Sequence, residues 1–140
     1  MYLLDTNIWL ERLLNQERSE EVGEFLSQIP SDLLGITDFS LHSIGVITTR
    51  LNKPDIFTLF LNDTCVEGAV QIISLVPAEL HRLIRVMEQY HLDFDDAYQY
   101  TAADEYHLLL VSFDADFDQT PIRRLTPAQA LQWEREHPAS

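Results

Sequence analysis

The sequence predicts an α/β fold in three layers, α/β/α, around a central and mostly parallel sheet. Short apolar runs alternate with longer helical stretches along the 140 residues, and strands separated by helices form βαβ units whose strands pair in parallel. The clearest run is LLLVS at residues 108–112, a continuous apolar pattern that is typical of a strand covered on both faces. No repeat, low-complexity block or linker divides the chain, so we expect one domain over residues 1–140.

Five strands are expected, each a short apolar run between helical segments. The first is the N-terminal run, which ends on Asp5, and the last lies just before Pro127. In chain order the strands are expected at residues 1–5, 33–37, 71–75, 108–112 and 122–125.

Helices are expected between these strands, where apolar residues recur at helical spacing. Thr6 or Asn7 offers an N-cap for the first helix, because a short polar side chain can accept from the free backbone N–H groups there. The helices are expected at residues 6–14, 19–29, 39–51, 54–63, 77–90 and 95–106, with a last one from Pro127. In the helix at 77–90, the residues expected to share one apolar face are Leu80, Leu83, Ile84 and Met87.

The charge of the chain is strongly negative. The formal net charge is -14 at pH 7, and Lys53 is the only lysine. Such acidity usually serves solubility, whereas a nucleic-acid binder normally carries basic residues that neutralise phosphates. Bound metal cations that reverse the local field, or a basic partner, are the alternatives.

Nothing in the sequence indicates export or a membrane. The single cysteine, Cys65, can form no disulfide within the chain, which fits a reducing compartment. The N-terminus lacks a basic stretch followed by an apolar one, and no apolar run approaches the ~20 residues of a membrane helix. We therefore expect a cytoplasmic protein.

Three acidic residues lie at the ends of expected elements. In an open parallel sheet, ligands bind outside the carboxyl ends of the strands. Asp5 closes the first strand, Asp114 comes two residues after the fourth, and Asp96 begins the helix before the fourth. We expect these carboxylates to meet at one edge of the sheet. Aspartate also favours helix N-caps and turns for local reasons, and the sequence leaves a capping role open for Asp95 or Asp96.

A cluster of carboxylates indicates a bound cation. Without one, the groups repel each other and raise each other's pKa. Oxygen ligands with no histidine or cysteine among them favour Mg²⁺ or Mn²⁺ over zinc, and such an ion can activate water for the hydrolysis of a phosphodiester. Motifs of several other enzyme classes, such as a phosphate-binding glycine loop, are missing. A receiver-type phosphorylation switch would need a lysine beside the acidic pocket, and Lys53 lies in a turn between two expected helices.

Several motifs resemble the PIN-domain family, and in particular its VapC-like toxin branch. LDTN at residues 4–7 is similar to the family's DTN segment at the end of the first strand, and SFDADF at residues 112–117 is similar to its TxDxDF segment. DA at residues 96–97 resembles the family's third acidic position, and the helix from Pro127 resembles its usual ending. The likeness extends over essentially the whole chain and implies a PIN-like fold.

The resemblance also implies roles and partners. It implies a metal-dependent endoribonuclease that hydrolyses RNA phosphodiesters with water activated by Mg²⁺ or Mn²⁺. It further implies an RNA substrate and, as protein partners, an antitoxin and a second copy of the chain. By the family pattern the metal ligands are Asp5, Asp96 and Asp114, Asp116 is a further catalytic acid, and the supporting residues are Thr6, Asn7, Ser43 and Ser112.

The sequence departs from the family pattern at one acidic position. The family places a glutamate about six residues after a serine or threonine at the end of the second strand, and here Ser43 stands at that distance from Thr37. Asp38, His42 or Glu11 could compensate for the missing glutamate. The alternative function is therefore a catalytically weakened PIN-fold module that binds RNA or a protein.

Overall fold

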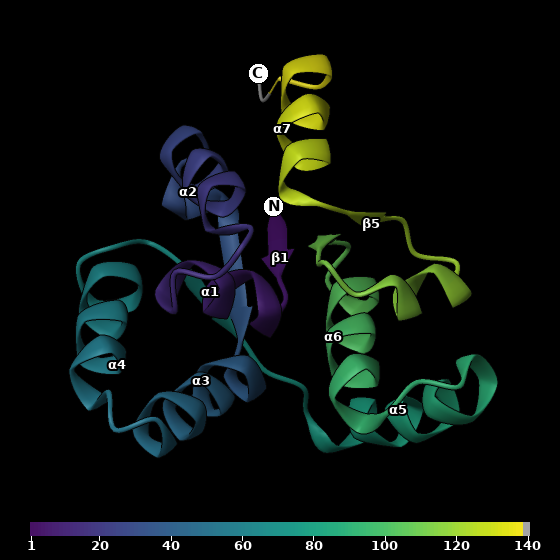
Figure 1. Ribbon diagram of the computed structural model, residues 1–140. Coiled ribbons are helices and arrows are strands. Elements are labelled where there is room, and N and C mark those ends of the chain that lie inside the picture. The colour runs from purple at the N-terminus through teal and green to yellow at the C-terminus, as the bar shows by residue number, and fades with distance from the viewer. Residues whose placement is uncertain (139–140) are drawn as a thin grey trace.

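A five-stranded parallel sheet lies at the centre of the computed structural model, which describes residues 1–138 (Figure 1). The strands follow the order β3-β2-β1-β4-β5, and every neighbouring pair is parallel. This arrangement confirms the predicted α/β class. The strands are β1 (Tyr2–Leu4), β2 (Leu34–Thr37), β3 (Gln71–Ile73), β4 (Leu109–Val111) and β5 (Arg124–Leu125).

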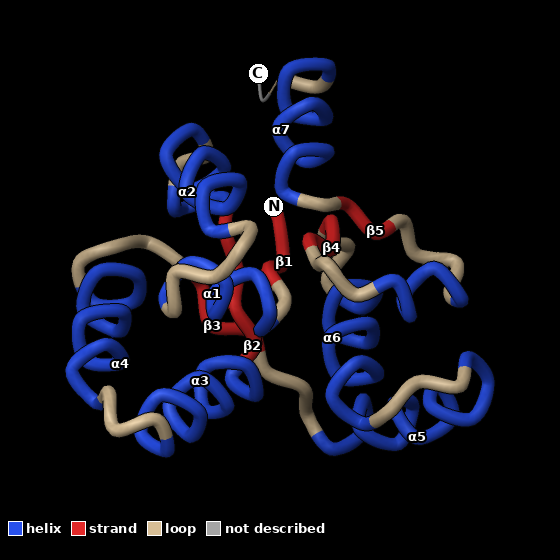
Figure 2. The backbone as a smooth tube through the Cα atoms, viewed as in Figure 1, coloured by secondary structure: helices blue, strands red, loops and turns tan. Residues whose placement is uncertain are grey.

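Seven α-helices in the described residues connect the strands and cover both faces of the sheet (Figure 2). They are α1 (Thr6–Leu13), α2 (Ser19–Gln28), α3 (Asp38–Arg50), α4 (Pro54–Leu61), α5 (Pro77–Tyr90), α6 (Phe94–Glu105) and α7 (Pro127–Glu136). Shorter helical turns are η1 (Ser31–Leu33), the π-helical η2 (Asn62–Val66) and η3 (Ala115–Gln119). None of the described helices is long and apolar enough to cross a membrane.

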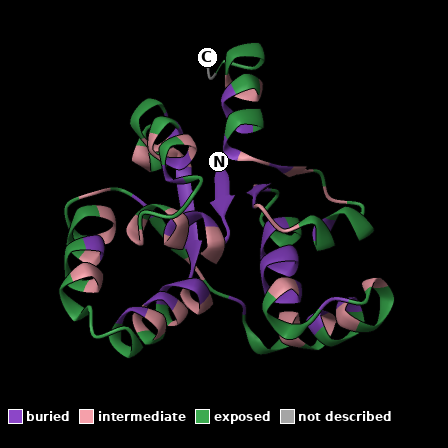
Figure 3. Cartoon of the chain, in the orientation of Figure 1, coloured by how far each residue is buried: buried purple, intermediate pink, exposed green. Residues whose placement is uncertain are grey.

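The hydrophobic core forms two clusters, one on each face of the sheet. Successive residues of a strand point to opposite faces, so Tyr2 and Leu4 pack with α1, α2, α3, α4 and α7, whereas Leu3 packs with α5 and α6. β1, β2 and most of β4 are therefore buried from both sides, as the colouring of β1 in Figure 3 shows, whereas β3 at the edge of the sheet is mostly exposed. Burial on both faces explains why β4 is a continuous apolar run instead of an alternating one.

The central strand β1 is the point at which the chain changes direction across the sheet. The chain first passes outward from β1 through β2 to β3, then crosses to β4 on the other side of β1 and ends the sheet with β5. The segments after β1 and β4 pack on opposite faces, because α1 contributes to one core cluster and η3 to the other. Open α/β sheets bind ligands at such a switch point, and Asp5 and Ser112 directly follow the two strands there.

The expected elements are present, and their ends differ from expectation by no more than two residues. Two details differ. The N-cap of α1 is Asp5, not Thr6 or Asn7. Ile84, expected on the buried face of α5, is 48% exposed, because α6 covers the side of α5 that carries Leu83 and Val86.

Candidate metal centre

Asp5 stands at the junction of β1 and α1 and is only 6% exposed. Its backbone N–H extends the pairing with β4 by donating to the carbonyl oxygen of Val111 at 2.9 Å. Its carboxylate oxygen Oδ1 accepts from the Thr6 N–H at 2.8 Å and caps α1. Because the same aspartate ends the strand and begins the helix, its carboxylate is fixed at the carboxyl edge of the sheet.

Two buried side chains complete the hydrogen bonds of the Asp5 carboxylate. Ser112, just after β4, donates its hydroxyl to Oδ2 at 2.7 Å. Gln99, on α6, donates Nε2 to Oδ1 at 3.0 Å. Gln99 belongs to none of the motifs that predict the site. The available signal is its spacing, because a residue three positions after Asp96 lies on the same face of the helix.

Asp96 and Asp114 reach the same place from α6 and from the loop after β4. The N-cap of α6 is Asp93, which accepts from the Asp96 N–H at 2.9 Å, so neither Asp95 nor the half-buried Asp96 caps the helix. Asp114 caps η3 by accepting from the Asp116 N–H at 2.9 Å. One carboxylate oxygen from each of Asp96, Asp114 and Asp116 lies within 4.8 Å of the other two.

These side chains surround a pocket of about 270 Å³. Asp5, Asp96 and Asp114 all line it, so the three carboxylates expected at this edge are brought together, with the exposed Asp116 beside them. The described residues that line the pocket include no cationic side chain. The full lining is Asp5, Thr6, Asn7, Leu10, Ser43, Ile47, Asp95, Asp96 and Asp114.

The pKa values of the carboxyl groups of Asp5 and Asp96 lie above those of isolated aspartates. The pKa of Asp96 is raised to about 8. Burial is the largest cause, and the negative charges of Asp114 and Asp93 are the next largest. Burial also raises the pKa of Asp5, although three hydrogen bonds to its carboxylate oppose the rise. A divalent cation would relieve this repulsion, and all the nearby donors are hard oxygens of the kind that Mg²⁺ and Mn²⁺ prefer. The residues present therefore fit such an ion.

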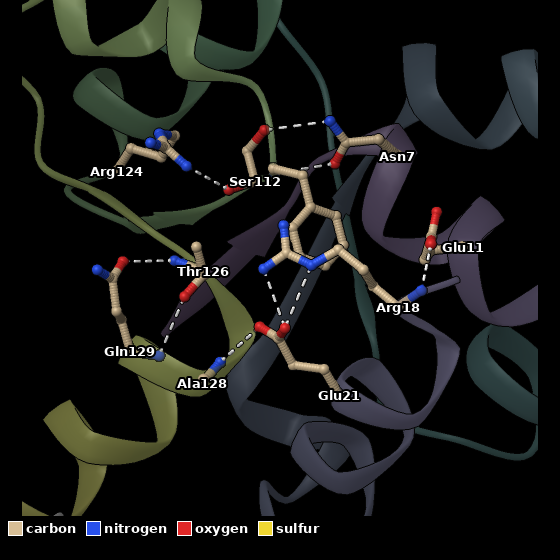
Figure 4. A network of polar contacts seen from close by, with 10 residues as sticks. Asn7, Glu11, Arg18, Glu21, Ser112, Arg124, Thr126, Ala128 and Gln129 are labelled. Atoms are coloured by element: carbon tan, nitrogen blue, oxygen red, sulfur yellow. Dashed lines mark hydrogen bonds and ion pairs between the residues drawn. The ribbon is translucent and has the colours of Figure 1, made fainter. Parts of the chain in front are cut away.

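The predicted supporting residues connect the elements of the site. The hydroxyl oxygens of Thr6 and Ser40 lie 2.7 Å apart, which links the start of α1 to α3. Asn7 donates Nδ2 to the Ser112 hydroxyl oxygen at 3.3 Å (Figure 4). The Asn7 side-chain oxygen also accepts from the Phe113 N–H at 3.3 Å. These contacts tie α1 to the loop after β4, which carries Asp114.

Two arginines brace this loop from outside the pocket (Figure 4). The guanidinium carbon of Arg18 lies 3.9 Å from the centre of the Phe113 ring. Arg124 donates to the Ser112 carbonyl oxygen at 3.2 Å and forms an ion pair with Asp118 at 3.0 Å. Both guanidinium groups belong to the framework that holds the loop, and neither lines the pocket.

The residues considered as substitutes for the missing glutamate do not line the pocket; they are Asp38, His42 and Glu11. Asp38 accepts from the Tyr98 hydroxyl at 2.6 Å, and Glu11 accepts from the Arg18 N–H at 2.6 Å. His42 is exposed on α3. Ser43, the residue expected to stand in place of the glutamate, lines the pocket, and Asp95 is a further acidic residue in the lining.

A parallel sheet of this order, with acidic side chains gathered beyond its central strand, defines an α/β protein of the PIN type. The chain belongs to the PIN-domain family, whose model matches residues 2–122. The resemblance to the PIN-domain family that the motifs indicate is thereby confirmed.

Solved structures with a similar fold include toxins and toxin–antitoxin complexes. A toxin–antitoxin complex from Klebsiella pneumoniae is 22% identical, with a TM-score of 0.71, and the match covers 91% of this chain and 98% of that one. VapC20 from Mycobacterium tuberculosis, a sarcin–ricin loop cleaving toxin, is 12% identical, with a TM-score of 0.76. The match covers 88% of this chain and 97% of VapC20. The matched chain of FitAcB from Neisseria gonorrhoeae is 17% identical, with a TM-score of 0.69. The match covers 91% of this chain and 99% of that one. No curated protein matches the chain.

Proposed function

We propose that the protein is a metal-dependent endoribonuclease of the VapC-like type, which hydrolyses RNA phosphodiesters with Mg²⁺ or Mn²⁺. The observation that carries this proposal is the pocket that Asp5, Asp96 and Asp114 line without a cationic side chain among the described residues. Membership of the PIN-domain family supports nuclease activity, and the likeness to a sarcin–ricin loop cleaving toxin supports RNA as the substrate.

Asp96 and Asp114 form the centre of the proposed site, because they belong both to the pocket and to the close group of carboxylate oxygens. Asp5 adds a carboxylate from the buried side, and Asp116 adds one from the exposed side. A bound Mg²⁺ or Mn²⁺ would lower the pKa of a water molecule and offset the charge of the scissile phosphate. Ser112 would hold the site together, because its hydroxyl donates to the Asp5 carboxylate and accepts from the Asp114 N–H.

One observation favours the second candidate function, a weakened PIN module that binds RNA or protein. Ser43 lines the pocket, and we take it to stand where the family has its glutamate. Its hydroxyl supplies no formal charge, so an ion there would have one negative ligand fewer and would bind less tightly.

The function is tested by cleavage of a mixed single-stranded RNA in the presence of Mn²⁺. Asp96→Asn and Asp114→Asn should each lower the cleavage rate at least ~100-fold, because each removes a negative ligand. The matched control is Glu88→Gln, which removes an exposed carboxylate on α5 outside the pocket. Cleavage that persists in EDTA or in Asp114→Asn would contradict the proposal, and an inert wild type that still binds RNA would favour the module.

We propose further that an antitoxin-like protein occupies an apolar groove on the other side of α1. This groove of about 350 Å³ lies between α1, α2 and α4, and its apolar lining consists of Trp9, Leu13, Leu26, Ile56, Leu59 and Phe60. A partner helix with apolar side chains would bury this lining. The toxin–antitoxin complexes among the similar structures support such a partner.

Leu59→Glu tests this second proposal, because it places a charge in the apolar groove and leaves the acidic pocket intact. The variant should no longer bind the partner, and its rate of RNA cleavage should stay unchanged.

A further inference from the structure

Gln99 is a buried amide that connects three parts of the site. The residue lies on α6 and is 2% exposed. Its Nε2 donates to Asp5 Oδ1 at 3.0 Å and to the Ser40 hydroxyl oxygen at 2.6 Å. Its Oε1 accepts from the Thr37 hydroxyl at 2.8 Å. Since Thr37 is the N-cap of α3, these contacts join the end of β1, the first turn of α3, and α6.

The partners of Gln99 fix the orientation of its amide. An ionised carboxylate can only accept hydrogen bonds, so the NH₂ group of Gln99 must face Asp5. Both of its N–H groups are then in use, one on Asp5 and one on Ser40. A glutamate of the same shape would have no N–H to offer and would repel Asp5, whereas an apolar side chain would leave three buried polar groups without this partner.

Gln99 also determines which oxygen of Asp5 remains available. Oδ1 already accepts from the Thr6 N–H at 2.8 Å, so the bond from Gln99 engages its second lone pair. Oδ2 accepts from the Ser112 hydroxyl at 2.7 Å and keeps one lone pair. The carboxylate therefore has one saturated oxygen and one oxygen that can still take a partner.

We propose that Gln99 is a positioning residue for the cation site, which locks the Asp5 carboxylate through Oδ1 and leaves Oδ2 as the oxygen offered to a divalent ion. This inference rests on the proposed metal-dependent function. Burial raises the pKa of Asp5, and among the hydrogen bonds that oppose the rise, the one from Gln99 has the largest effect. Because Gln99 follows Asp96 by three residues, one face of α6 supplies both a proposed ligand and the group that positions another.

The test compares Gln99→Met with Thr101→Val. Gln99→Met keeps the approximate length of the side chain and removes the amide. Thr101→Val is the matched control, because Thr101 is buried on the same helix and its hydroxyl has no partner within the described residues. The Mn²⁺ dissociation constant is measured from the electron paramagnetic resonance signal of free Mn²⁺, and the melting temperature is measured in EDTA. Gln99→Met should weaken Mn²⁺ binding about ten- to hundredfold, and Thr101→Val should leave it unchanged.

A purely structural role would give a different result. Gln99→Met would then melt at a lower temperature but bind Mn²⁺ as tightly as the wild type, and this outcome would overturn the proposal. Should Gln99→Met not fold, Gln99→Asn keeps an amide that is too short to reach Asp5, and the same loss of Mn²⁺ affinity is expected.

A wild type that binds no Mn²⁺ would refute the proposed function, and the metal-free melting temperatures would then decide whether Gln99 holds Asp5. Gln99→Met should lower the melting temperature less in an Asp5→Ala background than in the wild type, because the bond to Asp5 is already lost. Equal losses in both backgrounds would overturn the inference.

Discussion

Asp5 combines three tasks in one side chain: it follows the central strand, caps α1 and lines the acidic pocket. A buried charge is costly unless it is paired or hydrogen-bonded. Here the bonds from Thr6, Gln99 and Ser112 offset part of that cost, and the raised pKa of Asp5 shows that burial still outweighs them. A residue held in this way costs stability in the free protein, and the proposed cation would offset that cost.

Asp96 predicts how stability depends on pH in the metal-free protein. Its pKa of about 8 in the folded state exceeds the ordinary value of 3.8, so the folded state binds this proton more tightly than the unfolded state does. The contribution of Asp96 to stability is therefore largest at low pH and is lost as the pH rises from about 4 to about 8. Urea unfolding in EDTA across this range should show the decline, and Asp96→Asn should flatten it. Equal slopes for the two proteins would contradict the assignment.

Ser43 allows a gain-of-function prediction. If Ser43 replaces the family's glutamate, Ser43→Glu adds a negative group to the pocket that Asp5 lines. Mn²⁺ should then bind about tenfold more tightly, which corresponds to about 1.4 kcal/mol, and RNA cleavage should rise. Calorimetric titration with Mn²⁺ measures the first effect, and a single-stranded RNA assay measures the second.

Asp5→Asn provides the control for Ser43→Glu, because it should abolish cleavage in both backgrounds. A wild type that cleaves briskly and gains nothing from Ser43→Glu would show that another residue completes the site. In that case Asp95 is the first candidate, since its carboxylate also lines the pocket.

At the scale of elements, the strands and helices could be predicted because each has its own local pattern. The apolar run of β4 and the proline at the start of α7 are visible in the sequence without any tertiary knowledge. The placement of Asp5 and Asp114 followed, because a parallel sheet brings the carboxyl ends of its strands to one edge. The spacing from Asp96 places Gln99 on the same face of α6, but its hydrogen bonds to Asp5 and Ser40 could not be predicted, since they depend on how closely α6 packs against the end of β1. The failure of Asp38 to reach the pocket likewise depends on packing, because Tyr98 binds its carboxylate.

The last helix, α7, has a local signal that can be tested. Thr126 accepts from the Gln129 N–H at 3.2 Å, and the Gln129 side chain accepts from the Thr126 N–H at 2.9 Å, so the two form a capping box. Thr126→Ala should lower the free energy of unfolding by about 1 kcal/mol, as the loss of an N-cap typically does. Urea unfolding measures this change, and Thr126→Ser, which keeps the hydroxyl, should recover most of it. An unaffected Thr126→Ala variant would show that the Glu21 contact to the Ala128 N–H holds the helix start by itself.

At the scale of the whole molecule, the charge of -14 opposes the binding of RNA. Several of the few cationic groups are already paired within the fold. Arg82 pairs with Asp104 and Glu105, Arg18 with Glu21, and Arg124 with Asp118. The other six Lys and Arg side chains are in no ion pair within the described residues, but 23 Asp and Glu side chains outnumber all nine cationic ones. A divalent ion at the acidic pocket would add positive charge where the proposed substrate would lie.

The binding of RNA should therefore depend on a divalent ion and weaken as salt is added, since electrostatic attraction is screened. The Kd for a labelled single-stranded RNA can be measured by fluorescence anisotropy. It should be high in EDTA and at least about tenfold lower with Mn²⁺, which corresponds to a gain of about 1.4 kcal/mol in binding free energy. Asp114→Asn should lose the response to Mn²⁺ even though it makes the protein less negative, whereas Glu88→Gln removes the same charge outside the pocket and should keep it. This pair separates an ion held at the pocket from general screening, because screening would affect both variants alike. RNA binding that is equally tight in EDTA would mean that the phosphates meet the protein elsewhere, at arginines that no carboxylate of the fold engages.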